Sequence, residues 1–207
     1  MAMLTGAPAP ASSPLCAPQR IPGPKDFDQV VAPRFGRTVA RRVRRGEIGL
    51  TLATAASAID RLRVASRESV SRVVSRNPDS LWVFIRHGTL VGFMAMMMFN
   101  EEGLEALLGN RVNVQDPAPE HLAAAGESPA AIYFWAMASP AIAADGIAKV
   151  IMRLQAPPYR RADLYTYPAT ADGLRFARAF GFEPIPGHPR NLLRYIRKIN
   201  REHQFVD

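Results

Sequence analysis

The sequence predicts a fold of the α/β (α+β) class, because strand-like and helix-like patterns alternate along the chain from residue 47 onward. Three segments support this prediction: two apolar runs joined by His87-Gly88, an apolar run at 131–138, and a helical pattern that ends at Gly181. Of the 207 residues, 48% are hydrophobic and 21% are charged, so a core of ordinary size can form. The length excludes a large multidomain assembly, and the composition excludes a globally disordered chain.

The N-terminal part of the chain differs from the rest. Residues 1–25 are dominated by Ala, Pro, Ser and Gly and are expected to form a disordered tail. Residues 26–46 are expected to be a basic linker or a basic amphipathic helix, because Phe35, Val39 and Val43 recur every four positions among arginines. Such a helix either packs its apolar stripe on the domain or docks on an acidic partner, such as nucleic acid or an anionic membrane.

Residues 47–99 predict a strand, a helix and a hairpin. The strand is expected at 47–53, and the helix is expected to begin at Thr54 and to run to about Val74. The hairpin consists of strands at 80–86 and 89–99 around the His87-Gly88 turn. The second of these runs is apolar on both faces, which indicates a central strand that is covered on both sides.

The remaining segments continue the alternation of strands and helices. A helix of about two turns at 101–108 begins a long, proline-punctuated connection that extends to residue 129, and connections of this length are often functional. The expected elements that follow are a strand at 131–138, a helix from about 146 to 154, a strand at 162–167, a helix capped by Thr170 that runs through Phe180, and closing strands at 182–186 and 191–199.

Charge and cysteine usage narrow the classes of function. The net charge is +8, and only three of the 26 basic residues are lysines, which leaves 23 arginines. This balance favours polyanionic partners or phosphate-bearing cofactors, or it reflects a compositional habit of the source. The single cysteine, Cys16, excludes an intramolecular disulfide framework, and the four histidines show no metal-binding spacing, so we expect no metal. No apolar run is long enough to span a membrane and no signal peptide is recognisable, so a cytoplasmic protein is expected.

The order of elements over about residues 47–199 resembles that of the GNAT superfamily of acyl-CoA-dependent N-acyltransferases. Three motifs carry the resemblance: IRHGTLVGFMAM at 85–96, DGIAKVIMR at 145–153 and GLRFARAFGFEP at 173–184. The resemblance implies a mixed, mostly antiparallel central sheet flanked by helices on both faces. It also implies a domain at 47–207 with an insertion at about 100–129, and acetyl-CoA or a longer acyl-CoA as the acyl donor.

A coenzyme A site is expected where the strand at 131–138 leads into the next helix. Backbone N–H groups at a helix start, with the positive end of the helix dipole, suit a pyrophosphate. The candidate binding residues are Met137, Ala138, Ser139, Ala144, Asp145, Gly146, Ile147 and Ala148. The family pattern Gln/Arg-x-x-Gly-x-Gly/Ala is matched in its last three positions, but Ala143 takes the place of Gln or Arg, and a carboxylate at Asp145 would weaken an anion site. The alternative is that small residues simply begin a packed helix.

The sequence leaves the proton-transfer residues open. Family members often carry a general-acid tyrosine on the last helix, and the corresponding position here is Ala177, so Tyr159, Tyr165 or Tyr167 would have to substitute for it. The strand at 131–138 holds no carboxylate. The candidates for a general base therefore lie in the insertion, where His121 could also line a site, and they are Glu101, Glu102, Glu105, Asp116 and Glu127.

A run of methionines lies on the expected central strand. Met94, Met96 and Met98 should point to one face and Met97 to the other. These flexible thioethers either border a pocket for a long or variable acyl chain, or fill the core.

The resemblance therefore implies an acyltransferase in which a neutral amine, on a small molecule or a protein, attacks the bound thioester directly. Two alternatives remain open: an acyl carrier protein serves as the acyl donor, or the domain is a non-catalytic GNAT-like binding module. All three require the strands at 131–138 and 162–167 to separate and leave a slot beside Ile147.

Overall fold

The computed structural model describes residues 38–58, 64–139 and 143–201. The tail expected at 1–25, the single cysteine and the first residues of the expected basic helix lie outside these ranges.

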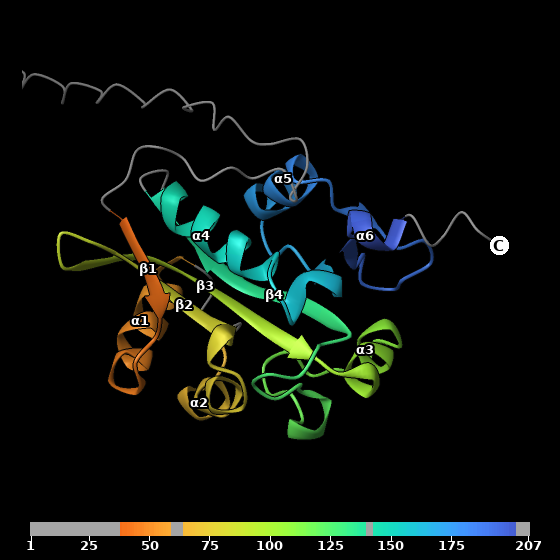
Figure 1. Ribbon diagram of the computed structural model, residues 1–207, viewed down its shortest axis with the longest axis horizontal. Helices are drawn as coiled ribbons and strands as arrows, with labels where there is room; N and C mark the ends of the chain where they lie inside the picture. Colours follow the sequence, from red (N-terminus) through yellow and green to blue (C-terminus); the bar gives the residue numbers. More distant parts are fainter. Residues whose placement is uncertain (1–37, 59–63, 140–142, 202–207) are drawn as a thin grey trace, which may run out of the picture.

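One mixed sheet forms the centre of the molecule (Figure 1). Its strands are β1 (Thr38–Arg42), β2 (Leu81–Arg86), β3 (Thr89–Phe99), β4 (Ala131–Ala138), β5 (Asp163–Thr166), β6 (Glu183–Pro184) and β7 (Leu193–Tyr195). They are arranged in the order β1-β2-β3-β4-β5-β7-β6, and only the β4–β5 pair is parallel. The predicted mixed, mostly antiparallel sheet is therefore confirmed.

Helices cover both faces of the sheet, as predicted. They are α1 (Ile48–Ala58), α2 (Arg67–Arg76), α3 (Glu101–Leu108), α4 (Ala144–Leu154), α5 (Ala171–Ala179) and the short α6 (Lys198–Arg201). Figure 1 shows α4 and α5 on one side of the sheet and α1, α2 and α3 on the other.

The expectation of an amphipathic helix within residues 34–45 is wrong over its described part, where residues 38–42 form the edge strand β1. Of the expected apolar stripe, Phe35 lies outside the described residues, and the other two members do not share a buried face, because Val39 is 54% exposed whereas Val43 is buried. A strand forms here because backbone pairing with β2 stabilises it more than the weak helical periodicity of the segment stabilises a helix. Arg41 and Arg42 pair with Glu47 and Asp79, so these two arginines do not form a free cationic face.

The strand expected at 47–53 is also wrong, because this segment forms most of helix α1. Its buried residues are Ile48, Thr51 and Ala55, spaced three and four apart, whereas Leu50 is 58% exposed. This spacing is helical, and the short apparent alternation in the sequence concealed it. The next helix, α2, is capped by the Ser66 side chain and not by Thr54.

The predicted elements after residue 80 are confirmed, with one exception. His87 and Gly88 both have positive φ, as a two-residue hairpin turn requires. Thr170 caps α5, and Gly181 adopts the left-handed conformation just beyond it. The exception is the closing strand expected at 191–199, which ends at Tyr195 and gives way to α6.

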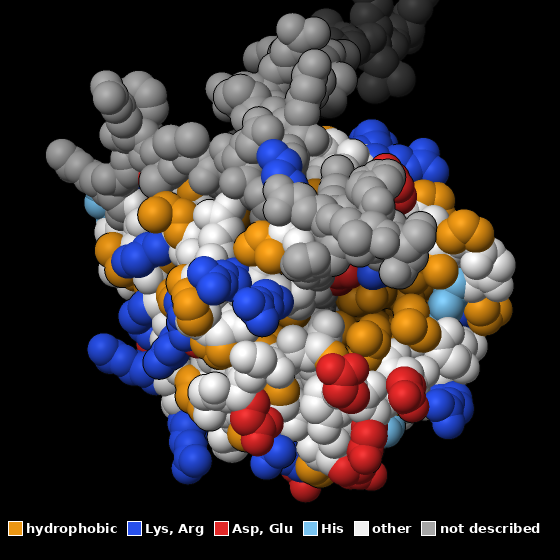
Figure 2. Space-filling model, turned by 45° about the vertical axis from the view of Figure 1, so that its right-hand side comes forward, with side chains coloured by type: hydrophobic (Ala, Val, Ile, Leu, Met, Phe, Trp, Pro, Cys, Tyr) orange, Lys and Arg blue, Asp and Glu red, His pale blue; other side chains and the backbone are white. Residues whose placement is uncertain are grey.

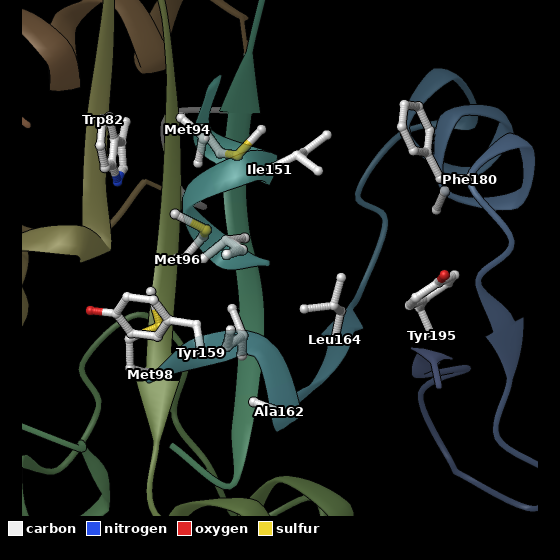
Figure 3. Close-up of a cluster of buried hydrophobic side chains, with 14 of the residues drawn as sticks. Trp82, Met94, Met96, Met98, Ile151, Tyr159, Ala162, Leu164, Phe180 and Tyr195 are labelled. Carbon is white, nitrogen blue, oxygen red and sulfur yellow. The ribbon is translucent and has the colours of Figure 1, made fainter. Parts of the chain in front are cut away.

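The methionine run contributes mainly to the core. Met94, Met96 and Met98 lie on the α4 side of β3, and Figure 3 shows them with Ile151 of α4 in one buried cluster. Met97 belongs to the cluster on the opposite face. The predicted orientation of all four is therefore confirmed, and at most 1% of each side chain is exposed.

A buried carboxylate fastens α4 to the sheet. Asp79 lies two residues before β2, and only 3% of its side chain is exposed. Its carboxylate accepts hydrogen bonds from Arg42 of β1, Arg153 of α4 and Tyr159. The guanidinium of Arg153 also lies 4.7 Å from the centre of the Tyr159 ring. These contacts fix the C-terminal half of α4, and thereby direct its N-terminus toward the end of β4.

Candidate functional site

The sheet opens between β4 and β5. Their parallel pairing runs from Ala131–Asp163 to Phe134–Thr166, beyond which β4 continues to Ala138 whereas β5 ends. A cleft of about 190 Å³ lies at this point. Its walls come from β3, β4, the loop after β5, α4 and α5, and they consist of Met94, Phe134, Trp135, Ala136, Met137, Ile147, Ile151, Thr166, Tyr167, Pro168, Ala169, Thr170, Gly173, Phe176, Ala177 and Phe182. The predicted slot beside Ile147 is therefore present.

A β-bulge lies at the mouth of this opening. Ala95 of β3 pairs with Ala136 and Met96 pairs with Phe134, so Trp135 is an extra residue without a partner on β3. A bulge bends its strand and redirects side chains, and here it directs the Trp135 side chain to the face that carries α1, α2 and α3. The bulge and the separation of β4 from β5 together shape the cleft. No sequence pattern predicted the bulge.

The structure divides the eight expected cofactor-binding residues into two groups. Met137 and Ile147 line the cleft. The others lie around it without lining it: Ser139 and Asp145 are half-buried, Ala144 is exposed, Ala138 pairs with Phe93 of β3, and Gly146 and Ala148 are buried. The cleft is therefore bounded at one end by the first turn of α4.

Gly146 has a packing role that the sequence did not reveal. A Cβ atom on this residue would lie 2.6 Å from the ring of Phe84, which is fully buried. The family-like glycine is therefore required by the contact between α4 and the sheet, whatever binds nearby.

Replacing Gly146 with alanine should lower the free energy of unfolding by about 1–3 kcal/mol, because Phe84 has no room to move. Gly49→Ala in α1 is the matched control. A Cβ there meets nothing within 4 Å, so the helix should gain about 0.5–1 kcal/mol. Denaturant unfolding of both variants provides the measurement, and equal stability of the two would contradict this assignment.

The departure at Ala143 also has a physical cause. This residue occupies the N-cap of α4, is fully buried in the core cluster and makes no side-chain cap. A glutamine or arginine at this position would bury a long polar side chain among apolar ones.

A second pocket lies on the opposite face of the sheet. It holds about 100 Å³ and is lined by Thr51, Leu52, Ala55, Val64, Ala65, Val70, Val73, Val74, Ser80, Leu81, Phe93, Ala95, Trp135, Ala136 and Ala169. The last three of these also line the cleft, so the two spaces adjoin at the bulge. The sequence did not predict this pocket, because one of its walls is α1, whose first half was predicted to be a strand.

Of the three candidate tyrosines, only Tyr167 lines the cleft. Tyr159 is buried and hydrogen-bonded to Asp79, and Tyr165 is buried and lies beneath the opposite face. The hydroxyl of Tyr167 lies 3.2 Å from Nε2 of His188, and desolvation raises the pKa of this tyrosine above its ordinary value.

The hydroxyl of Tyr167 lies among the contacts of His188. The backbone N–H of Arg190 donates to Nδ1 of His188, and Nε2 of the same ring lies 3.2 Å from the Tyr167 hydroxyl and 3.4 Å from the carbonyl oxygen of Leu107. When Nε2 carries the ring proton it can donate to either oxygen, and the phenolic proton of Tyr167 can then be donated elsewhere.

The expected general bases do not reach either space. All five candidate carboxylates are exposed, and none lines the cleft or the second pocket. Asp116 instead binds Ser69 and Arg72, and Glu127 accepts a hydrogen bond from the backbone of Ala124. His121 lines neither space. The insertion packs through Leu107, Val112 and Leu122 as part of the core.

The described residues contain neither a metal-binding cluster nor a membrane-spanning helix. No group of three or more His, Cys, Asp or Glu in residues 38–58, 64–139 and 143–201 could hold a metal ion. Within the same ranges, no helix combines the length and apolar character needed to cross a membrane.

Comparisons with known proteins found similarity only among solved structures. No protein-family model matches the sequence, and no curated protein matches it. Among solved structures, the loading GNATL domain of CurA from Lyngbya majuscula has a TM-score of 0.57 at 15% identity, over 78% of this chain and 98% of that domain. Two further matches have TM-scores of 0.46. One is the GphF GNAT-like decarboxylase in complex with isobutyryl-CoA, at 19% identity over 70% of this chain and 72% of that one. The other is Ard1 from Thermoplasma volcanium, at 12% identity over 76% and 94%. The chain therefore has the fold of the GNAT-like domains.

Proposed function

We propose that the protein binds an acyl-CoA in the cleft between β4 and β5 and transfers its acyl group to a neutral amine. The observation that carries this proposal is the opening of the sheet beyond Phe134 and Thr166, beside the first turn of α4. Among the described residues, no strand pairs with β4 beyond Phe134 on the β5 side, so backbone groups of β4 can bind the amides of a pantetheine.

The residues present fit most of such a ligand. The apolar walls suit the aliphatic parts of pantetheine, and Met137 and Ile147 lie where the chain would pass from β4 to α4. The α4 N-terminus would face the pyrophosphate with backbone N–H donors. The half-buried carboxylate of Asp145 opposes an anion there, so the backbone donors must outweigh it.

The reaction in this site is direct attack. The amine nitrogen forms a bond to the thioester carbonyl carbon, and the carbon–sulfur bond breaks. The departing sulfur takes the proton of Tyr167, which regains a proton from solvent, while the attacking nitrogen loses its proton to water, because none of the described residues that line either space is a carboxylate. Proximity in the cleft supplies a large part of the acceleration.

Replacing Tyr167 with phenylalanine should lower kcat by about 100-fold or more, because a general acid contributes that much. KM for the acyl-CoA should change little, since only the hydroxyl is removed. Tyr165→Phe is the matched control, because Tyr165 lies two residues earlier, on β5, and does not line the cleft. Steady-state kinetics provide the test, and equal kcat for the two variants would remove Tyr167 from the mechanism.

Binding of the donor is tested by thermal shift with coenzyme A and acetyl-CoA. A ligand at 100 times its Kd stabilises the folded state by about 2.7 kcal/mol, which raises Tm clearly. If neither compound raises Tm at any concentration up to 1000 times a micromolar Kd, the proposed acyl-CoA site is wrong.

Two specific observations favour alternative functions. Ala177 lines the cleft where a general-acid tyrosine would project, which favours a non-catalytic binding module. That alternative predicts ligand binding without turnover for every amine tested. The net charge of +8 favours an acidic acyl carrier protein as the donor or partner, and in Figure 2 Lys and Arg side chains lie mainly on the left of the visible face whereas Asp and Glu side chains gather in its lower part. That alternative predicts turnover with an acyl carrier protein that weakens with salt.

A further inference from the structure

The second pocket contains a buried hydroxyl group without a partner. Ser80 immediately precedes β2, has 2% of its surface exposed and lines the pocket. Its Oγ makes no hydrogen bond to any described residue. A buried hydroxyl left unpaired costs free energy, so native proteins usually provide it with a partner.

The other walls of this pocket exclude a charged ligand. Among the described residues that line it, none is Asp, Glu, Lys, Arg or His, and its second hydroxyl, that of Thr51, already donates to the carbonyl of Glu47. The other described lining residues are all Ala, Val, Leu, Phe or Trp. A charged group placed there would lose its hydration without compensation.

The size of the pocket limits its occupant. An apolar cavity of about 150 Å³ holds benzene, which has six heavy atoms. By the same measure, a pocket of about 100 Å³ holds an aliphatic group of about four heavy atoms.

We propose that this pocket binds a short, uncharged aliphatic part of a substrate, of about four carbon atoms, that carries one hydroxyl or carbonyl oxygen hydrogen-bonded to Ser80 Oγ. The inference rests on the proposed function, because the pocket adjoins the cleft at Trp135, Ala136 and Ala169. A group reaching past the bulge from the thioester carbon would enter it. The group comes either from the acyl chain or from the acceptor amine, and both sources share this chemistry.

Two matched pairs of probes distinguish the sources. The acyl pair is butyryl-CoA and 3-hydroxybutyryl-CoA, and the acceptor pair is butylamine and 4-amino-2-butanol. Affinities are measured by calorimetry on the full chain, and the amines are added at a pH that leaves a neutral fraction. We expect the hydroxylated member of one pair to bind about fivefold to tenfold more tightly than its partner, as one neutral hydrogen bond allows.

Ser80→Ala should abolish that preference, because the alanine has no hydroxyl and leaves the pocket otherwise unchanged. Its Tm without ligand should equal or exceed that of the wild type, since an unpaired buried hydroxyl is lost. Ala65→Phe supplies a second test that does not depend on Ser80. Ala65 is half-buried at the pocket wall and does not line the cleft, so the phenyl ring should fill the pocket while coenzyme A binding persists.

The outcomes separate the two proposals. A hydroxyl preference in either pair that Ser80→Ala removes supports the pocket assignment and identifies the source. No preference in either pair, or a preference that Ser80→Ala leaves intact, overturns it. If coenzyme A itself fails to bind while the amine pair shows the Ser80-dependent preference, the proposed acyl-CoA site fails and the pocket stands.

Discussion

Replacing Asp79 with alanine is expected to destabilise the fold by about 2–3 kcal/mol, because charge-assisted hydrogen bonds are lost from a buried carboxylate while Arg42 and Arg153, 51% and 31% exposed, can regain water. The loss leaves Arg42, Arg153 and the buried hydroxyl of Tyr159 without their shared acceptor. Because Arg153 belongs to α4, the variant should also loosen the helix that borders the cleft. Denaturant unfolding measures the effect.

The control for this variant is Asp172→Ala. Asp172 pairs with Arg175 one turn away on α5, and 82% of its side chain is exposed. Removing an exposed pair of this kind should change the stability by less than about 0.5 kcal/mol. Similar losses of stability for the two variants would show that the cluster formed by Asp79, Arg42, Arg153 and Tyr159 does not hold α4 in place.

The same cluster predicts a pH dependence. Burial alone would raise the pKa of Asp79. Hydrogen bonds from Arg42 and Tyr159, together with the charges of Arg42 and Arg153, lower this pKa by more than burial raises it, so it lies below the ordinary value. A depressed pKa stabilises the folded state above the unfolded value of about 3.9, and this contribution is lost as the pH falls through the folded pKa. Asp79→Asn, which cannot ionise, should therefore show a flatter decline in stability below about pH 4 than the wild type.

Ala169→Trp should lower kcat/KM by about 100-fold or more, since even small misplacement of reacting groups can cost that much. Ala169 is exposed in the loop after β5 and lines both the cleft and the second pocket. An indole placed there would block their junction without entering the core.

Ala179→Trp is the matched control for that experiment. Ala179 is also exposed, lies at the end of α5 and lines neither space. Both variants should unfold at nearly the wild-type Tm. If Ala169→Trp retained full turnover and full acyl-CoA binding, the junction of the two spaces would not be the reaction site.

The sequence predicted those parts of the fold in which local signals and tertiary packing agree. The His87-Gly88 turn, the apolar run of β4, the Thr170 cap and Gly181 each indicated an element that the structure contains. The prediction failed at residues 38–42 and 48–53, where β1 and the first half of α1 were assigned the wrong type. The β1 strand exists because β2 offers it a ladder, and a partner 40 residues away leaves no local signal.

The candidate site was predicted only in its location. The slot beside Ile147 follows from the order of elements, but three of its features arise from long-range contacts. The bulge at Trp135 depends on the register between β3 and β4, the need for Gly146 depends on Phe84, and the unpaired hydroxyl of Ser80 depends on the packing of α1 and α2. None of these contacts is encoded in a short motif.

Hydrogen exchange with and without coenzyme A tests the central claim most directly, because it locates the ligand on the chain. We predict that bound coenzyme A slows exchange of the backbone amides at residues 135–139 and 144–148, at the open edge of β4 and the first turn of α4. Unchanged exchange in both segments under conditions where calorimetry shows saturation would mean that the ligand binds elsewhere, and the opening between β4 and β5 would not be the acyl-CoA site.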